Sequence, residues 1–138
     1  MKILLVEDSP SDALFAIRAL KKHAPDSDVF HVNDGVEAMD FLHQRAQWSD
    51  GASPDLILLD LNLPRMNGHE VLRAIKSDHA LRRIPVVVLT TSYREPDIVD
   101  AYDSHSNAYL IKPVDLSDFD RMVKVLVDFW IGFNRLPA

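Results

Sequence analysis

The sequence predicts an α/β fold in which parallel strands alternate with helices, and three observations support this. Short apolar runs rich in Ile, Leu and Val recur along the 138 residues, as is typical of strands that are covered on both faces. The segments between these runs carry apolar residues at the spacing of an amphipathic helix. Strand and helix alternate five times, which favours a doubly wound parallel sheet with right-handed crossovers.

Each predicted strand is followed by one predicted helix. The clearest strands are residues 3–6, 56–59 and 86–89, and the weaker ones are residues 28–32 and 108–111. Five such strands predict a flavodoxin-like (βα)5 sheet with the strand order 2-1-3-4-5. The helices are indicated by apolar residues that lie three or four positions apart: Ala13, Ile17 and Leu20; Val36, Met39 and Leu42; Val71, Leu72 and Ile75; Ile98, Val99 and Tyr102; Phe119, Met122, Val123 and Leu126.

The chain is expected to form one domain. Its length suits a single hydrophobic core, and no linker or internal repeat divides it. The longest loop-like stretch is residues 47–54, and the five strand–helix units use nearly everything up to residue 126. We therefore predict a single domain over residues 1–138, in which residues 127–138 form a C-terminal helical extension.

Acidic residues directly follow two of the predicted strands. Glu7 and Asp8 come after the first strand, and Asp60 comes after the third. In the predicted order these strands are neighbours, and their carboxyl ends lie where such sheets bind ligands. Three carboxylates in one small space repel one another unless a cation neutralises them or one stays protonated. The pattern predicts a site for a hard divalent cation, and Mg²⁺ suits a site of few carboxylates completed by water and phosphate oxygens.

A purely structural explanation exists for each acid taken alone. Ser9, the proline after it and Asp12 make an ordinary helix start, which would leave Glu7 and Asp8 as solvated loop acids. Asp60 alone could be a turn residue. Their joint placement at one sheet edge favours the site.

Two further strand ends complete the pattern. The fourth strand ends at Thr90, which offers a hydroxyl, and the fifth ends at Lys112, which offers an ammonium group. A phosphoryl group in transfer needs a nucleophile, a metal ion, a cation for its remaining negative charge and a hydroxyl donor. The strand ends together supply all of these.

Four motifs resemble the response-regulator receiver domains of the CheY-like family over residues 1–126. They are "VED", "LLDLNLPRMNG", "VVVLTTS" and "YLIKP". The resemblance implies that Asp60 accepts a phosphoryl group from a phosphohistidine of a sensor histidine kinase. The protein would then be a phosphoacceptor that assists its own phosphorylation and dephosphorylation, not an enzyme. Asp8 would bind Mg²⁺ directly, Glu7 through water and Asn62 through its backbone carbonyl, with Mn²⁺ as a second candidate.

The same resemblance implies roles for residues near the ends of the fourth and fifth strands. Lys112 would pair with Asp60 before transfer and with the phosphoryl group afterwards. Thr90 would move toward the phosphoryl group and the ring of Tyr109 would follow, which remodels the surface of the fourth helix, fifth strand and fifth helix. The peptide bond before Pro113 is expected to be cis.

Three features depart from the usual pattern of the family, and one is Leu63 in place of the common Met, a tolerable apolar exchange. Thr91 stands where Ala, Gly or Ser is common, and its larger side chain is expected to narrow access to Asp60. Residues 104–109 lack the usual Gly-Ala pair, so we expect an altered turn between the fourth helix and the fifth strand. The six histidines show no paired ligand spacing, although His69 could influence the loop after the third strand.

The C-terminal segment carries more apolar residues than one helix face needs. Phe129, Trp130 and Phe133 continue the apolar run to the chain end, and a surplus of this kind marks interaction sites. The tail also resembles stand-alone receivers that are paired with bacterial phytochrome kinases. That resemblance implies a phytochrome as the kinase and a homodimer through the fourth helix, the fifth strand with Tyr109, the fifth helix and the tail. Alternatively, Trp130 and Phe133 fold back over their own subunit.

The composition disfavours several other partners. A net charge of −6 disfavours nucleic acid, whose binding rests on Lys and Arg. The absence of cysteine agrees with a reducing compartment. No apolar stretch is long enough to span a membrane and no leader is evident, so we expect a cytoplasmic protein without a membrane partner or an output domain.

Two rival functions stay open at this point. A pseudo-receiver would dock partners without phosphate, which the intact set of acids, hydroxyl and lysine argues against. An aspartyl phosphatase of the haloacid-dehalogenase type also places an Asp after a strand. It normally needs a second Asp two residues on, where this chain has Asn62.

Overall fold

The computed structural model describes residues 1–45 and 53–137, and within them it contains a five-stranded parallel sheet. The strands are β1 (Lys2–Val6), β2 (Asp28–Val32), β3 (Leu56–Leu59), β4 (Val86–Thr90) and β5 (Ala108–Ile111). Their order is β2-β1-β3-β4-β5, and all neighbouring pairs are parallel. The predicted fold class and strand order are confirmed.

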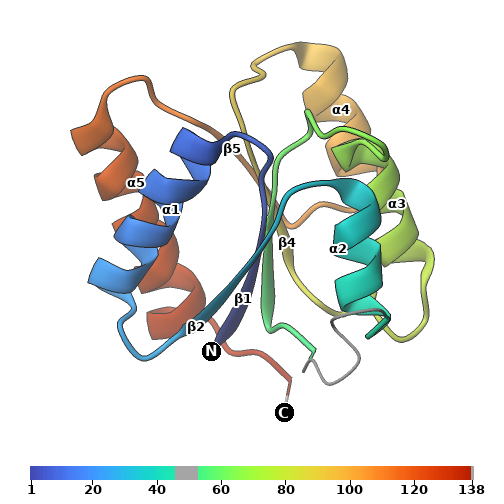
Figure 1. The fold of residues 1–138 in the computed structure, drawn as a ribbon, viewed down its shortest axis with the longest axis horizontal. Helices are drawn as coiled ribbons and strands as arrows, with labels where there is room; N and C mark the ends of the chain where they lie inside the picture. Colours follow the sequence, from blue (N-terminus) through green and yellow to red (C-terminus); the bar gives the residue numbers. More distant parts are fainter. Residues whose placement is uncertain (46–52, 138) are drawn as a thin grey trace.

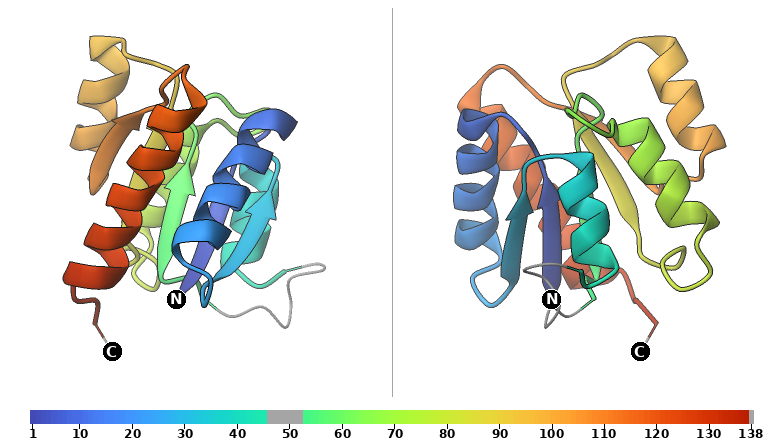
Figure 2. Two further views of the ribbon diagram at one scale, coloured as in Figure 1. Left: turned by 90° about the vertical axis from the view of Figure 1, so that its left-hand side faces the viewer. Right: turned by 45° about the vertical axis from the view of Figure 1, so that its right-hand side comes forward.

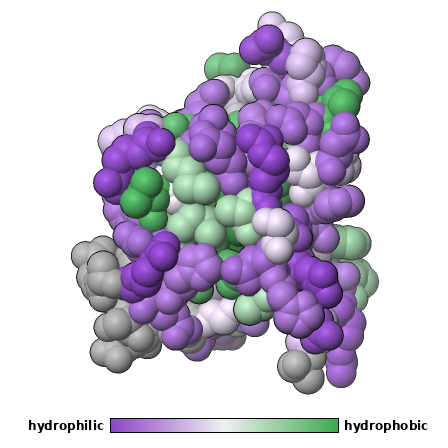
Figure 3. Space-filling model, turned by 90° about the vertical axis from the view of Figure 1, so that its right-hand side faces the viewer, coloured by the Kyte–Doolittle hydropathy of each residue, from purple (hydrophilic) through white to green (hydrophobic). Residues whose placement is uncertain are grey.

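Helices cover both faces of the sheet (Figure 1). On one face lie α1 (Pro10–His23) and α5 (Leu116–Val127), and on the other lie α2 (Gly35–Leu42), α3 (Gly68–Ser77) and α4 (Glu95–Asp103). Two further views show the same layers (Figure 2). The face formed by α2, α3 and α4 is mainly hydrophilic, around a smaller hydrophobic area (Figure 3).

The core consists of two clusters, one under each helix layer. Because successive side chains of a strand point to opposite faces, Leu4 and Ile57 join the cluster of α2 and α3, whereas Leu5 and Leu58 join that of α1 and α5. All of these side chains are at most 2% exposed. The apolar runs of β1 and β3 are therefore buried from both sides, as their sequences predict.

Side-chain caps fix where four of the helices begin. Ser9, Asp34, Asn67 and Asp115 each accept a hydrogen bond from a backbone N–H in the first turn of the following helix. These groups have no partner inside the helix, so the caps hold each loop at the carboxyl edge of the sheet. The helix start expected at Ser9 is present, with a proline in the first turn of α1.

The C-terminal extension leaves the α-helical geometry after α5. A π-helix, η2 (Asp128–Phe133), follows α5, and residues 134–137 are not helical. Trp130 packs partly buried against the core cluster of α1 and α5, and its ring meets that of Phe129 edge-on at 5.1 Å. Phe133 is 86% exposed. Trp130 thus folds back over its own subunit, while Phe133 faces solvent.

The turn between α4 and β5 uses a left-handed histidine. The φ angle of His105 is 69°, a conformation that glycine adopts without strain and that L-residues rarely take. The N–H groups of His105 and Ser106 donate to the carbonyls of Tyr102 and Ala101, which closes the end of α4 as a glycine would. The turn in residues 104–109 is therefore altered as expected, because His105 takes a backbone conformation that a glycine would adopt without strain.

Three further expectations concern the peptide bond before Pro113, the loop 47–54 and the absence of a membrane span. The peptide bond before Pro113 is trans, so the predicted cis bond is wrong; the two isomers of an X–Pro bond differ by only about 0.5–1 kcal/mol, which sequence alone does not decide. Most of the predicted loop 47–54 lies outside the described residues. No helix within the described ranges is long and apolar enough to cross a membrane.

His105→Gly should raise the free energy of unfolding by about 0.5–1 kcal/mol. Glycine removes the steric cost of the left-handed backbone, and this gain exceeds the extra chain entropy that glycine loses on folding. Urea unfolding measures the change. His79→Gly, at an exposed site with an ordinary φ angle, should be destabilising, and a His105→Gly variant that is no more stable than the wild type would contradict the argument.

Candidate phosphoryl-transfer site

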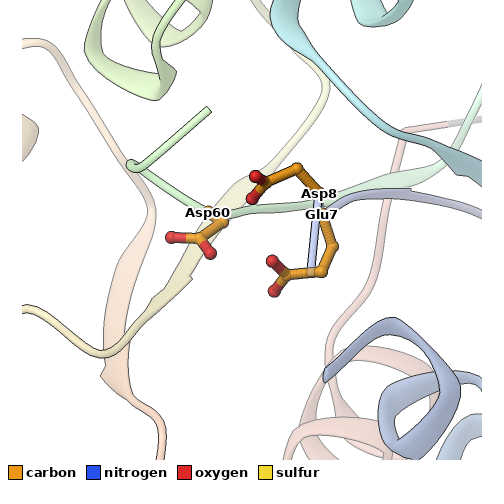
Figure 4. A group of neighbouring side chains, drawn as sticks. All are labelled: Glu7, Asp8 and Asp60. Atoms are coloured by element: carbon orange, nitrogen blue, oxygen red, sulfur yellow. The ribbon is translucent and has the colours of Figure 1, made fainter. Parts of the chain in front are cut away.

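Three carboxylates meet at the carboxyl ends of β1 and β3. Val6 and Leu59 are partners in the sheet register, so the residues that follow them are held side by side. The N–H of Asp60 also donates to the carbonyl of Val6 at 3.1 Å. One oxygen or more from each of Glu7, Asp8 and Asp60 lies within 4.8 Å of the others, and all three point into one space (Figure 4). Within this acidic group, Glu7 and Asp60 are buried and Asp8 is exposed.

Lys112 brings a positive charge to the acidic group from the end of β5. Its N–H donates to the carbonyl of Thr90 at 2.8 Å, which extends the β4–β5 pairing by one residue. Its buried ammonium donates to Oδ2 of Asp60 at 3.0 Å and makes a short hydrogen bond to Glu7. Buried charges persist only when they are paired in this way.

Burial and neighbouring charges shift the pKa values of Glu7 and Lys112. Burial raises the pKa of Glu7 from its ordinary value of 4.5 to about 7, helped by its hydrogen bond and charge contact with Asp60 and opposed by Lys112. Burial works against the charged form of Lys112 as well, but its hydrogen bond to Glu7 and the negative charges around it raise its pKa overall. Glu7 is therefore harder to ionise than an exposed glutamate, even with Lys112 beside it.

The loop between β3 and α3 holds the other oxygen of Asp60. The N–H of Asn62 donates to Oδ1 of Asp60 at 3.2 Å. Gly68 allows α3 to begin close by, since a Cβ atom there would lie 2.3 Å from the carbonyl oxygen of Asp60. The two carboxylate oxygens of Asp60 thus have different partners, a backbone N–H and the ammonium of Lys112.

A hydroxyl and an aromatic ring lie beside the acidic group on the β4 side. Thr90 is fully buried, and its Oγ1 accepts from the N–H of Ser92 at 3.4 Å. Tyr109 donates its hydroxyl to the carbonyl of Ser92 at 2.9 Å, and burial raises the pKa of this phenol. Ser92 therefore connects Thr90 and Tyr109, the two residues for which the family resemblance implies a joint movement.

Sequence reasoning missed two contributors to the site. Asp12 had been assigned only to the helix start, yet its Oδ2 accepts from Lys112 at 3.0 Å. Ser92 had no predicted role, although its hydroxyl also donates to Asp97 in α4 at 2.6 Å. A signal for Asp12 was present, because the first turn of a helix after β1 begins at the same sheet edge as Glu7 and Asp8. Thr91, expected to narrow access, is exposed and lines a pocket of about 200 Å³ with Asp12 and Lys112.

The donor set suits a hard divalent cation. Three carboxylates offer only oxygen ligands, and they are few enough to leave room for water and phosphate oxygens. Burial and the neighbouring Asp60 make ionisation of Glu7 unfavourable, as its raised pKa indicates. A bound cation would supply that charge at the side of Asp60.

Glu7→Gln should stabilise the metal-free protein above pH 7, and the gain should shrink as the pH falls. Because the pKa of Glu7 is raised from 4.5 to about 7 in the folded state, folding strengthens proton binding there. The resulting stability is fully present below pH 4.5 and is lost as the pH rises through about 7. Gln does not ionise, so the variant should gain on the order of 2 kcal/mol over the wild type at about pH 8.

Urea unfolding in a chelator, from about pH 5 to about pH 8, measures this difference. Glu37→Gln makes the same exchange in the first turn of α2, outside the acidic group, and serves as the control. A stability difference for Glu7→Gln that stays constant with pH would show that burial of Glu7 does not have the proposed effect.

Comparison with known proteins shows the family. Residues 3–124 match the response regulator receiver domain. The chain is 46% identical over 136 residues to response regulator Rcp1 of Synechocystis sp., covering 99% of this chain and 92% of that protein. It is 44% identical over 137 residues to the probable methanogenesis regulatory protein FilR2 of Methanothrix harundinacea, covering 99% of this chain and 87% of that protein.

Solved structures of receiver proteins also resemble this chain. The phosphorylated cyanobacterial phytochrome response regulator RcpA matches with a TM-score of 0.95 and 47% identity, covering 99% of this chain and 98% of that one. The Mn²⁺-bound form of Rcp1 matches with a TM-score of 0.94 and 45% identity, covering 99% of each chain. The chain belongs to the response regulator receiver domains, the phosphoacceptor family of two-component signalling.

Proposed function

We propose that the chain accepts a phosphoryl group on Asp60 from a phosphohistidine of a sensor histidine kinase. One observation carries this proposal. Asp60 is a nearly buried carboxylate whose two oxygens are held by an N–H and by Lys112, with two further carboxylates within 4.8 Å. Such an arrangement fixes a nucleophile beside a cation site, which is what phosphoryl transfer needs.

The residues of the site divide the chemistry among them. An oxygen of Asp60 forms a bond to phosphorus while the bond from phosphorus to the histidine nitrogen breaks, so that an acyl phosphate and a free histidine result. Lys112 neutralises charge on the phosphoryl oxygens, and Asn62 holds Oδ1 of Asp60 in place during approach. Mg²⁺ is the proposed cation, with Mn²⁺ as a second candidate, held by Asp8, Asp60, Glu7 and the carbonyl of Asn62. When bound, it would neutralise charge on the transferred group.

The signal is proposed to leave the site through Thr90 and Tyr109. A phosphoryl group on Asp60 offers acceptor oxygens that compete for the Thr90 hydroxyl. Because Ser92 touches both Thr90 and Tyr109, a shift of Thr90 disturbs the partner of the Tyr109 hydroxyl. The surface of α4, β5 and α5 would respond as a shift between two populated states.

A bacterial phytochrome is the proposed kinase. RcpA is a phytochrome response regulator and resembles this chain over nearly its whole length. The protein would act in the cytoplasm as a phosphoacceptor that assists its own phosphorylation and dephosphorylation.

Asp60→Asn should abolish phosphoryl transfer, because the amide oxygen is a poor nucleophile. Transfer of radiolabel from an autophosphorylated phytochrome kinase, in the presence of Mg²⁺, measures this. Asp55→Asn, at the opposite end of β3, is the matched control and should be labelled like the wild type. Undiminished labelling of Asp60→Asn would show that Asp60 is not the phosphoacceptor.

The rival functions give different results in the same experiment. A wild-type protein that is never labelled by any kinase or by acetyl phosphate would be a pseudo-receiver. A protein that releases phosphate from unrelated phosphate monoesters would be a phosphatase.

We also propose that a second copy of the chain covers the outer side of β5 and α5. A groove of about 820 Å³ lies there, lined by residues of β5, α5 and η2 that include Leu110, Val125, Phe129 and Trp130. Val125 and Phe129 are at least half exposed, and Phe133 is more so. Apolar residues gathered beside an edge strand are typical of an interface between subunits. Tyr109 lies in β5 but packs against the core cluster on the other face of the sheet, so its part in the interface stays a prediction.

Phe129→Asp and Phe133→Asp should each shift the protein from dimer toward monomer, because each places a charge in the proposed interface. Light scattering coupled to size exclusion gives the mass. Leu14→Asp introduces the same charge at an exposed apolar position of α1 and should leave the mass unchanged. A mass that none of these variants alters would place any interface elsewhere.

A further inference from the structure

Asp12 contacts the ammonium of Lys112 from outside the acidic group. It lies in the first turn of α1, and its Oδ2 accepts from Nζ of Lys112 at 3.0 Å. The side chain of Asp12 is 35% exposed, whereas that of Lys112 is 5% exposed. The ammonium thus reaches toward the surface at Asp12 and is buried at its contacts with Glu7 and Asp60.

The contacts of Lys112 account for its whole hydrogen-bonding capacity. An ammonium has three donors and no acceptor, and Lys112 contacts three carboxylates, those of Glu7, Asp12 and Asp60. Two of these belong to the acidic group found among the described residues, and Asp12 does not. Asp12 is therefore the acceptor that does not also belong to the candidate cation site.

A divalent cation and the ammonium would share the carboxylates of Glu7 and Asp60. Both draw on Glu7 and Asp60, and two positive charges a few ångströms apart repel each other. An ammonium that hydrogen-bonds to a third carboxylate at the rim of the site loses less when a cation takes over the first two. Without that third acceptor, the ammonium has only the acidic group to bind.

We propose that Asp12 is a positioning residue that keeps the Lys112 ammonium bound at the rim of the site when a divalent cation draws on Glu7 and Asp60. This inference rests on the proposed function, in which the acidic group binds a cation beside Asp60. It gives Asp12 a role in metal loading that acts through Lys112 and requires no direct bond to the metal.

A purely structural role for Asp12 makes a different prediction. An acid in the first turn of a helix interacts favourably with the helix dipole, and this would affect stability without affecting the cation site. Asp118 occupies the same position in α5, three residues after its cap, and pairs with Arg121. Asp118→Asn is therefore a matched control for the loss of an acid at a helix start.

Isothermal titration calorimetry of Mg²⁺ binding to the full chain tests the proposal. The titration is done at about 150 mM salt, because salt at this level screens exposed charges that lie more than about 8 Å apart. Asp12→Asn should weaken Mg²⁺ binding about threefold to tenfold, which lies between the small net effect of exposed ion pairs and the larger effect of breaking buried ones. Asp118→Asn should leave the affinity within about twofold. Asp12→Glu, which restores the carboxylate, should recover part of the loss, and thermal melting confirms that each variant is folded.

The same titration in a Lys112→Gln background separates positioning from a direct charge effect. If Asp12 acts through Lys112, Asp12→Asn should change the Mg²⁺ affinity of this background by less than about twofold, because no ammonium remains to be positioned. An equal loss in both backgrounds would show that Asp12 acts by its own charge, and it would overturn the proposal.

The outcomes also separate this inference from the proposed function. Wild-type affinity in Asp12→Asn, together with normal phosphorylation of Asp60, would refute the role of Asp12 and leave the proposed function intact. A wild-type protein that binds no Mg²⁺ would overturn both.

Discussion

The site depends on one ammonium group among several carboxylates. Lys112 is buried and contacts Glu7, Asp12 and Asp60, so it links the ends of β1, β3 and β5 with the start of α1. Burial alone would lower the pKa of Lys112, and the surrounding negative groups raise it overall. Burial is also the main cause of the raised pKa of Glu7, and contact with Asp60 adds to it. Under the proposed function, a cation bound beside these acids would offset their negative charge.

Polar contacts carry the influence of the site away from the sheet edge. Ser92 touches Thr90, Tyr109 and Asp97, three residues on different elements. Of the residues of α4, only Ala101 is buried, and the helix is tied to α3 by contacts of Asp97 and Asp100 with His69. An element held by polar contacts near the surface opens at lower cost than one packed in the core. That would suit α4 to the proposed mechanism, in which Thr90 changes its partner.

The candidate site and the apolar groove beside β5 and α5 are stabilised by different kinds of interaction. At the carboxyl edge of the sheet, charged groups are buried and paired, and small movements change strong interactions. Along the outer side of β5 and α5, apolar groups line an open groove instead, where the gain comes from removing surface from water. Under the proposed function, a change of charge at Asp60 would be expressed as a change in apolar contact along this groove.

The sequence by itself determined the architecture and most of the site. Apolar runs of the length of a strand, each followed by a helical pattern, leave few topologies once crossovers must be right-handed, and the order β2-β1-β3-β4-β5 followed from them. Glu7, Asp8, Asp60, Thr90 and Lys112 could be placed together because each directly follows or ends a strand. Parallel strands bring their carboxyl ends to one edge, whatever their separation along the chain.

Only the tertiary structure decided how side chains share their partners. From the sequence, Asp12 is explained as an acid at the start of a helix. Its contact with Lys112 depends on how close α1 and β5 lie in the folded chain. The trans bond before Pro113, the left-handed backbone of His105 and the inward packing of Trp130 were likewise fixed by their surroundings. The physical reason is that each of these choices has local alternatives within about a kcal/mol or two. Packing and charge contacts between distant segments select among them, and those contacts exist only in the folded chain.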